Sequence, residues 1–294
     1  MIVILGIILV LGAIAGGYTM EHGNFKVLIQ PAELVIIFGA AIGTVVAANP
    51  ISILKRLAGG IIGLLKGSPY SKAMYLDTLK MLYEVFNNAR RLGVTKLEEE
   101  LDHPEKSPVF TKYPKFLKNH HALDFLCDTL RMTVSGGVEV MDIDQMMEVD
   151  LDVHHREGHQ PVAALATMAD SLPGLGIVAA VLGVVITMGA LGGPKEEIGH
   201  KVAAALVGTF LGILLCYGVF GPMASAIGKQ NDAEGNYYGF LRMAALAYCR
   251  GMPPIMCVEL ARRAIPTEVR PRFAEMEQAC RAGGSKAPAA DAAA

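Results

Sequence analysis

The sequence predicts an all-α integral membrane protein, with four transmembrane helices in two pairs and a large helical cytoplasmic domain. The chain of 294 residues is 52% hydrophobic and yet 18% charged, a mixture typical of a protein that lies partly in lipid and partly in water. Its apolar residues gather in four stretches, residues 2–19, 32–48, 173–190 and 202–227, with no charged residue near the middle of any. No alternating strand pattern of any length appears elsewhere.

Each apolar stretch is long enough to cross a membrane, since a helix needs about 17 to 25 apolar residues to span the hydrocarbon. The first stretch lacks the Lys or Arg that precedes the core of a secretory signal peptide, which indicates a retained anchor. Lys and Arg number 14 in residues 49–172 and 9 in residues 228–294, against 1 and 2 in the short connectors. Because basic loops stay in the cytoplasm, both termini and the middle block are expected there.

These assignments divide the chain along its length. The predicted segments are transmembrane helices 1 and 2 in residues 1–48, a cytoplasmic helical domain in 49–172, transmembrane helices 3 and 4 in 173–227, a cytoplasmic helical tail in 228–282 and a disordered C-terminus in 283–294. The last segment is mostly Gly, Ala, Pro and Ser and has little to bury.

The cytoplasmic segments carry helical patterns with recognisable ends. One apolar stripe at three-and-four spacing stops at Gly93, a natural left-handed C-terminal residue. Thr95 and Glu98 then form a capping-box pattern, which predicts that a short second helix begins at Thr95. The predicted cytoplasmic helices are residues 71–92, a short helix from Thr95, residues 114–135, a helix from about Asp142 towards the third span, and residues 231–250 and 254–264.

Composition and motifs exclude several classes of function. The net charge is −2, and the basic residues form no single stripe, so nucleic-acid binding is not expected. The sequence shows no nucleophile with a base and no phosphate loop, which argues against an enzyme. His155 and His159 have the spacing of metal ligands on a helix, but with His154 and nearby acids they are interpreted as a solvated or packing group. No metal site and no cofactor are expected.

Small and polar residues inside the spans indicate helix packing. Glycines four residues apart allow helix backbones to approach closely in lipid, and three such pairs favour an oligomer. The pairs are Gly12 with Gly16, Gly39 with Gly43, and Gly208 with Gly212. The polar candidates are Glu33, Thr44, Asp170, Ser171, Thr187 and Thr209.

The polar and proline positions in the spans each leave two interpretations open. Glu33 and Asp170 lie at predicted span ends, where a carboxylate either reaches the interface as a simple cap or serves a function. Thr209 either bonds its own helix or lines a polar path with Ala180. Pro173 and Pro222, near the cytoplasmic ends of the third and fourth spans, are either simple kinks or hinges.

Five sequence runs together resemble the MotA family, the ion-conducting stator subunits of the bacterial flagellar motor. The runs are residues 17–18 (GY), 30–37 (QPAELVII), 170–185 (DSLPGLGIVAAVLGVV), 207–218 (VGTFLGILLCYG) and 253–259 (PPIMCVE). The resemblance covers nearly the whole chain up to about residue 281. It implies a multi-pass protein of the bacterial inner membrane, in a ring of five copies around two copies of a partner, MotB.

The resemblance also implies roles for individual residues. The partner's membrane aspartate would carry the ion past Ala180 and Thr209, and Pro173 and Pro222 would couple this event to the cytoplasmic arm. Arg90 and Glu98 would face oppositely charged residues of the rotor's switch-complex protein, where matched sign matters more than affinity. Glu99, Glu100 and Glu105 make this stretch more acidic than the family pattern leads one to expect.

The side chain at position 180 indicates the coupling ion, and the number and kind of spans separate the competing functions. Sodium needs several oxygen ligands, and the methyl group of Ala180 supplies none, so protons are favoured over sodium. The nearest rival is a TolQ or ExbB type of proton-channel energiser of the cell envelope, which has three spans. A secondary transporter would show inverted repeats and interrupted helices, and a purely structural scaffold would pass no ions even with a partner.

Overall fold

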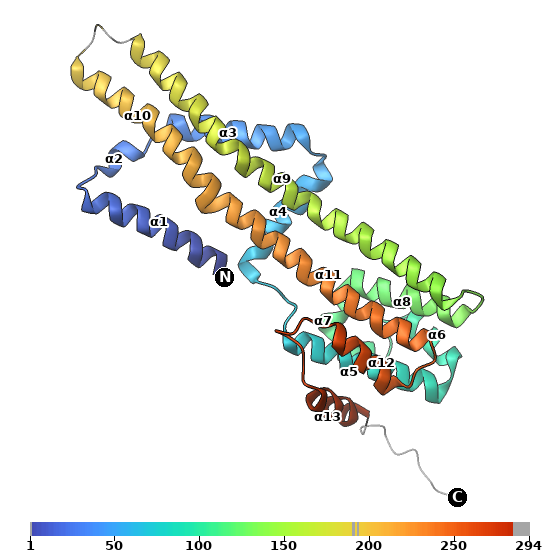
Figure 1. Cartoon of the computed structure of the whole chain (residues 1–294). Helices are drawn as coiled ribbons and strands as arrows, with labels where there is room; N and C mark the ends of the chain where they lie inside the picture. The colour runs from blue at the N-terminus through green and yellow to red at the C-terminus, as the bar shows by residue number, and fades with distance from the viewer. Residues whose placement is uncertain (1, 190–191, 193, 285–294) are drawn as a thin grey trace, which may run out of the picture. The chain divides into compact units, whose positions relative to one another are not determined.

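The computed structural model describes residues 2–189, 192 and 194–284, and every regular element in this part of the chain is a helix (Figure 1). The all-α prediction is therefore confirmed. Contacts divide the chain into two compact units. Unit 1 comprises Met1–Gly67 and Arg156–Asn231, and unit 2 comprises Ser68–His155 and the chain from Asp232 onward. Two long helices, α9 (Val140–Met188) and α11 (Gly221–Cys249), contribute to both units.

Unit 1 contains the apolar helices. It is built from α1 (Ile2–Met20), α2 (Phe25–Leu28), α3 (Pro31–Ala48), α4 (Ile51–Lys66), the C-terminal part of α9, α10 (Lys195–Leu214), the π-helical segment η2 (Leu215–Phe220) and the start of α11. Four helical stretches in the described residues are long and apolar enough to cross a membrane, at Ile2–Met20, Phe25–Ala48, Val140–Met188 and Ile198–Cys249. The four spans expected from hydropathy are thus all helical.

Small residues allow α9 and α10 to pack backbone against backbone, and Figure 1 shows the two helices running antiparallel side by side. A β-carbon built on Gly212 would lie 3.0 Å from the α-carbon of Gly176, and one built on Gly183 would lie 2.9 Å from the β-carbon of Ala205. Any larger side chain would force the helices apart. This stripe of close contact is called the α9–α10 seam below.

The other two glycine pairs do not pack inside the chain. A β-carbon on Gly12, Gly16, Gly39 or Gly43 would meet nothing within 4 Å, and α1 has no buried residue. Only the pair Gly208 and Gly212 serves helix packing within one chain. The apolar faces of α1 and α3 that carry the remaining pairs are exposed in the single chain.

The fourth span changes its helical winding just before a proline. Residues Leu215–Phe220 form a π-helix, and α11 begins at Gly221 with Pro222 next to it. Pro222 has no backbone N–H to donate to the preceding turn, and a wider turn is a common way to accommodate such a gap. The span and the helix predicted for residues 231–250 are consequently one continuous helical path.

Unit 2 is a helical bundle around an aromatic core. Its elements are α5 (Lys72–Leu92), α6 (Val94–Asp102), the 3-10 turn η1 (Phe110–Lys112), α7 (Pro114–Leu117), α8 (His120–Ser135), the start of α9, the end of α11, α12 (Pro254–Ala264) and α13 (Phe273–Gly284). Tyr75, Phe86, Tyr237 and Phe240 are almost completely buried in this core. The rings of Phe86 and Tyr248 stack with centroids 4.7 Å apart.

Two predicted helix boundaries in unit 2 are wrong. Gly93, with φ 90°, ends α5 and is also the residue before α6, so the second helix begins at Val94 and Thr95 makes no side-chain cap. The helix predicted over residues 114–135 is two helices, α7 and α8. The break falls where the Asn119 side chain accepts a hydrogen bond from the Ala122 N–H at 3.3 Å, because an N-cap competes with helix continuation.

The C-terminal segment extends the helical part further than the sequence pattern indicated. α13 reaches Gly284, although residues 283–294 were expected to be disordered. Residues 285–294 lie outside the described residues.

Candidate functional site

The predicted ion-path residues lie at the α9–α10 seam. A β-carbon on Gly208 would stand 3.4 Å from the backbone nitrogen of Ala180, and one on Gly176 would stand 3.3 Å from the α-carbon of Thr209. The structure therefore brings Ala180 and Thr209 to one packed interface, and both are partly buried.

Thr209 is unlike the other hydroxyl residues of the spans. The hydroxyls of Thr44, Ser171 and Thr187 each donate to a carbonyl three or four residues back on their own helix, at 2.7 to 2.8 Å. Within the described residues Thr209 makes no such bond. Its hydroxyl is available to a group outside the chain.

Glu33 is the site residue that its sequence position did not reveal. It was placed at a span end, but its side chain is buried, 7% exposed, on the face of α3 that also carries Ile37, Ala41 and Val45. A β-carbon on Gly208 would lie 2.8 Å from its Oε2 atom. This oxygen has no hydrogen-bond partner in the described chain. Asp170, the other carboxylate expected at a span end, is exposed.

The two prolines lie in separate parts of unit 1. Pro173 is inside α9, partly buried. Pro222 is exposed and directly follows the π-helical turn. A second proline inside α9, Pro161, is buried and was not predicted to have a role.

The predicted rotor-facing charges lie on either side of the Gly93 turn. Arg90 is in the last turn of α5 and Glu98 is in α6. Both are exposed, and in the part of the chain that the structure describes neither forms an ion pair. The geometry is that of free surface charges, which suits contact with an external partner.

The acidic stretch around Glu98 is less exposed than its sequence suggests. Glu99 pairs with Lys96 at 2.6 Å. Glu100 is buried, and its Oε2 has no hydrogen-bond partner among the described residues. Burial raises the pKa of the Glu100 carboxyl above its usual value. Glu98 is therefore an exposed acid beside one paired and one desolvated neighbour.

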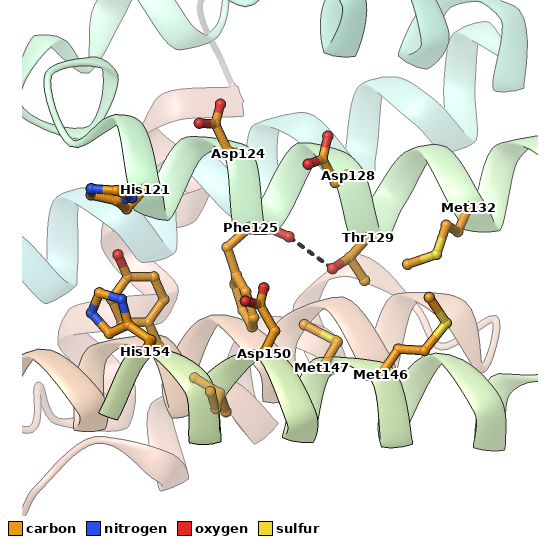
Figure 2. A pocket seen from close by; sticks show the side chains of 12 residues that line it. His121, Asp124, Phe125, Asp128, Thr129, Met132, Met146, Met147, Asp150 and His154 are labelled. Atoms are coloured by element: carbon orange, nitrogen blue, oxygen red, sulfur yellow. Dashed lines mark hydrogen bonds between the residues drawn. The ribbon is translucent and has the colours of Figure 1, made fainter. Parts of the chain in front are cut away.

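A pocket of about 440 Å³ in unit 2 was not anticipated (Figure 2). It lies between α8 and α9, and polar groups from both helices line it, with Tyr238 of α11. Figure 2 shows Asp124 and Asp128 on consecutive turns of α8, and His154 and Asp150 on α9. His154 Nε2 lies 3.5 Å from Glu234. The sequence signals of this polar face are two four-residue spacings, Asp124 with Asp128 and Asp150 with His154.

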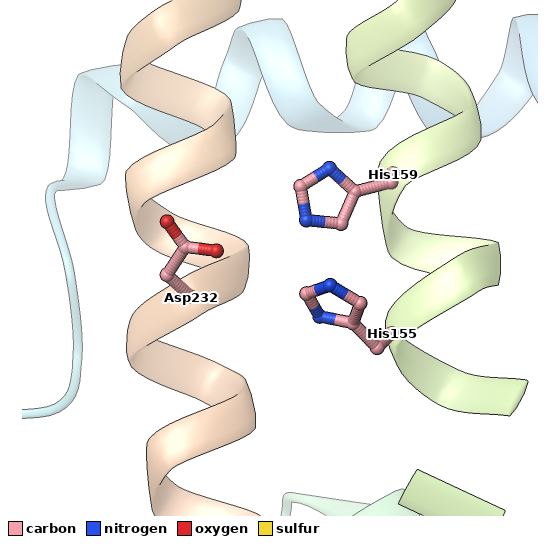
Figure 3. Close-up of side chains that lie close together, drawn as sticks. All are labelled: His155, His159 and Asp232. Atoms are coloured by element: carbon pink, nitrogen blue, oxygen red, sulfur yellow. The ribbon is translucent and has the colours of Figure 1, made fainter. Parts of the chain in front are cut away.

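The histidine group does not establish a metal site. Figure 3 shows His155 and His159 on consecutive turns of α9, and Asp232 on α11. His155 and Asp232 belong to unit 2, and His159 belongs to unit 1. His154 Nε2 lies 3.5 Å from Glu234 Oε1, and no metal is assigned to these residues.

Comparisons with known proteins place the chain in a family. The family model described as Motility protein A N-terminal matches residues 4–93, and the MotA/TolQ/ExbB proton channel family matches residues 118–238. The chain is 38% identical to Motility protein A of Escherichia coli (strain K12) and 37% identical to that of Salmonella typhimurium, each over 96% of both chains. Its fold is similar to a structure of C. jejuni MotAB, with a TM-score of 0.74 over 90% of this chain and 96% of that chain, at 20% identity.

The four candidate spans and the α9–α10 seam, together with these matches, define a multi-pass helical membrane protein of the proton-channel class. Sequence identity over almost the whole length narrows the class further. The chain belongs to the Motility protein A family.

Proposed function

We propose that this chain is the stator subunit of a bacterial flagellar motor and forms, with MotB, a proton-conducting complex that turns ion flow into torque. The observation that carries the proposal is the identity to Motility protein A of E. coli over 96% of both chains. Relatives of the same fold include the flagellar MotAB stator complex from Bacillus subtilis, with a TM-score of 0.71. The complex lies in the inner membrane, with both termini of this chain in the cytoplasm.

Ion passage takes place where the α9–α10 seam meets the membrane helix of the partner. Ala180 and Thr209 face the partner's acidic group there, and the unbonded Thr209 hydroxyl offers it one polar contact. Ala180 offers a methyl group and no oxygen ligand, which supports protons over sodium as the coupling ion. Moving one charge through about 100 mV provides about 2.3 kcal/mol.

Assembly uses apolar faces that the single chain leaves uncovered. α1 buries no residue, and a β-carbon built on Gly12, Gly16, Gly39 or Gly43 would meet nothing within 4 Å. Such faces pack against lipid or against further copies. They support assembly with further copies, which we propose form a ring of five around a MotB dimer.

Torque reaches the rotor through the exposed end of α5 and the start of α6. Arg90 and Glu98 present opposite charges there without internal partners, and they would steer the switch-complex protein into transient contact. Pro173 and Pro222 would transmit the membrane event to this arm as bends in α9 and at the start of α11.

Proton uptake into membrane vesicles tests this function. Vesicles holding this chain with its MotB partner are expected to take up protons, whereas vesicles holding either protein alone are not. Conduction by this chain alone would contradict the proposal.

Collapsing the proton and sodium gradients separately in motile cells identifies the coupling ion. Motility that fails only without the sodium gradient would overturn the proton assignment. The envelope-energiser alternative predicts conduction but normal swimming when the gene is deleted.

A further inference from the structure

Glu33 is the only buried acid of unit 1 among the residues whose side chains the structure describes. Three apolar residues, Ile37, Ala41 and Val45, continue its stripe along α3 at four-residue spacing. The packed face of α3 therefore begins with a carboxyl group and is otherwise hydrocarbon.

The neighbours of Glu33 lie inside the predicted spans. Gly208, whose β-carbon position is 2.8 Å from Glu33 Oε2, lies six residues inside the predicted span of residues 202–227. At about 1.5 Å per residue this corresponds to about 9 Å along the helix. The carboxyl group thus lies against an apolar part of α10, away from the charged first turns of that helix.

An ionised carboxylate is costly in such a place. Scales of membrane insertion give about 2.5 to 3.5 kcal/mol for a charged residue at the centre of a span. No Lys, Arg or His in the described residues forms an ion pair with Glu33, and Oε2 has no donor. A neutral acid avoids most of this cost.

The same contacts place the Glu33 carboxyl group beside the predicted ion path. The Gly208 position that faces Glu33 also lies 3.4 Å from the Ala180 nitrogen, and Thr209 is the next residue of α10. A purely structural role gives no reason for a carboxyl group with an unbonded oxygen here, because an unsatisfied buried polar atom costs about 1 to 3 kcal/mol.

We propose that Glu33 is a proton-binding site of this chain within the membrane and takes part in proton passage. This inference rests on the proposed function and deepens it, because it adds an acidic group of the chain's own to the path. Glu33 accepts a proton on one carboxylate oxygen and releases it, as a proton, to water or to the acidic group of the partner. No other bond forms or breaks.

Chemical labelling tests the protonated state directly. Dicyclohexylcarbodiimide modifies carboxyl groups that are protonated in apolar surroundings, and mass spectrometry of the labelled complex locates the adduct. We expect the adduct at Glu33 and not at Glu21, which is exposed beyond the end of α1. Absence of an adduct at Glu33, or equal labelling of the two residues, would overturn the inference.

Proton uptake by vesicles that hold both proteins tests the role in conduction. Glu33→Gln is expected to slow uptake by about a hundredfold, the lower end of what a positioned proton-transfer group contributes. Glu33→Asp should restore part of the rate, and Glu21→Gln should match the wild type. Uptake is normalised to the amount of complex in the vesicles, so a loss of assembly is not counted as a loss of conduction.

A second variant tests the geometry without removing the acid. Gly208→Ala places a methyl group against Glu33 Oε2 and should slow uptake in the wild-type background but have little further effect in the Glu33→Gln background. Wild-type uptake in Glu33→Gln would refute the inference and leave the proposed function intact. A wild-type complex that takes up no protons would refute the proposed function itself.

Discussion

Gly176 of α9 faces Gly212 of α10 so closely that a β-carbon on Gly176 would lie 3.2 Å from the α-carbon of Gly212. The contact is between backbones, so neither helix can yield by rotating a side chain. The seam that carries Ala180 and Thr209 therefore has a fixed register, set by small residues on both helices.

Replacing Gly212 with Ala is expected to destabilise the protein. The new β-carbon would stand 2.5 Å from the Leu172 carbonyl oxygen, which is backbone and cannot move alone. Overpacking of this kind costs about 1 to 3 kcal/mol. Thermal unfolding of the purified protein in detergent measures the loss. Gly199→Ala on the same helix, with nothing within 4 Å, is the matched control and should change little. Equal effects of the two substitutions would contradict the packing described.

Reversing the arm charges is expected to stop rotation without affecting the fold. Arg90→Glu and Glu98→Lys change exposed side chains that form no ion pair in the described chain, and such substitutions alter stability by about 0.5 kcal/mol or less. Swimming speed and the amount of protein in the membrane are measured together. Lys118→Glu, an exposed charge elsewhere in unit 2, should leave swimming intact. Normal swimming in both single-reversal variants would rule out the role of these charges.

Replacing Pro173 with Ala is expected to lower torque more than protein level. Alanine restores a backbone N–H that can bond the Ala169 carbonyl, which closes the hydrogen-bond gap that allows a helix to bend at a proline. Torque is measured on tethered cells, with immunoblotting for the amount of protein. Pro161→Ala, a buried proline in the same helix, provides the control and should keep torque. Unchanged torque in Pro173→Ala would remove the hinge role.

Stability of the protein should depend on pH through Glu100. Its folded-state pKa is raised by burial, so its favourable contribution is present below the unfolded value near 4.5 and is lost as pH rises through the folded value. At pH 7, Glu100→Gln is expected to be more stable than the wild type, because the neutral amide places no desolvated charge at this position. The difference should vanish below pH 4.5. Denaturant unfolding across this range measures it. Glu105→Gln, an exposed neighbour, should show no such dependence, and a Glu100 variant that is less stable at pH 7 would contradict the sign.

Local pattern was enough to predict the helices and most of their limits. Apolar length identified the four spans, because a helix must satisfy its own backbone in lipid. The apolar stripe that ends at Gly93 predicted α5. The helix predicted for residues 254–264 has the same limits as α12 in the structure. The exposure of Arg90 and Glu98 also followed from their place outside the apolar stripe.

Non-local contacts decided the rest. Position in the chain put Glu33 at a span end, but the first turn of α3 lies against Gly208 of α10, so the residue is buried. By their four-residue spacing the three glycine pairs are equally good candidates for close helix packing. Of these pairs, only Gly208 and Gly212 pack against another helix of the same chain. Periodicity states which residues share a face, since it follows from the geometry of one helix. Which faces meet, and at what depth, depends on how the helices pack, and only the tertiary structure contains that information.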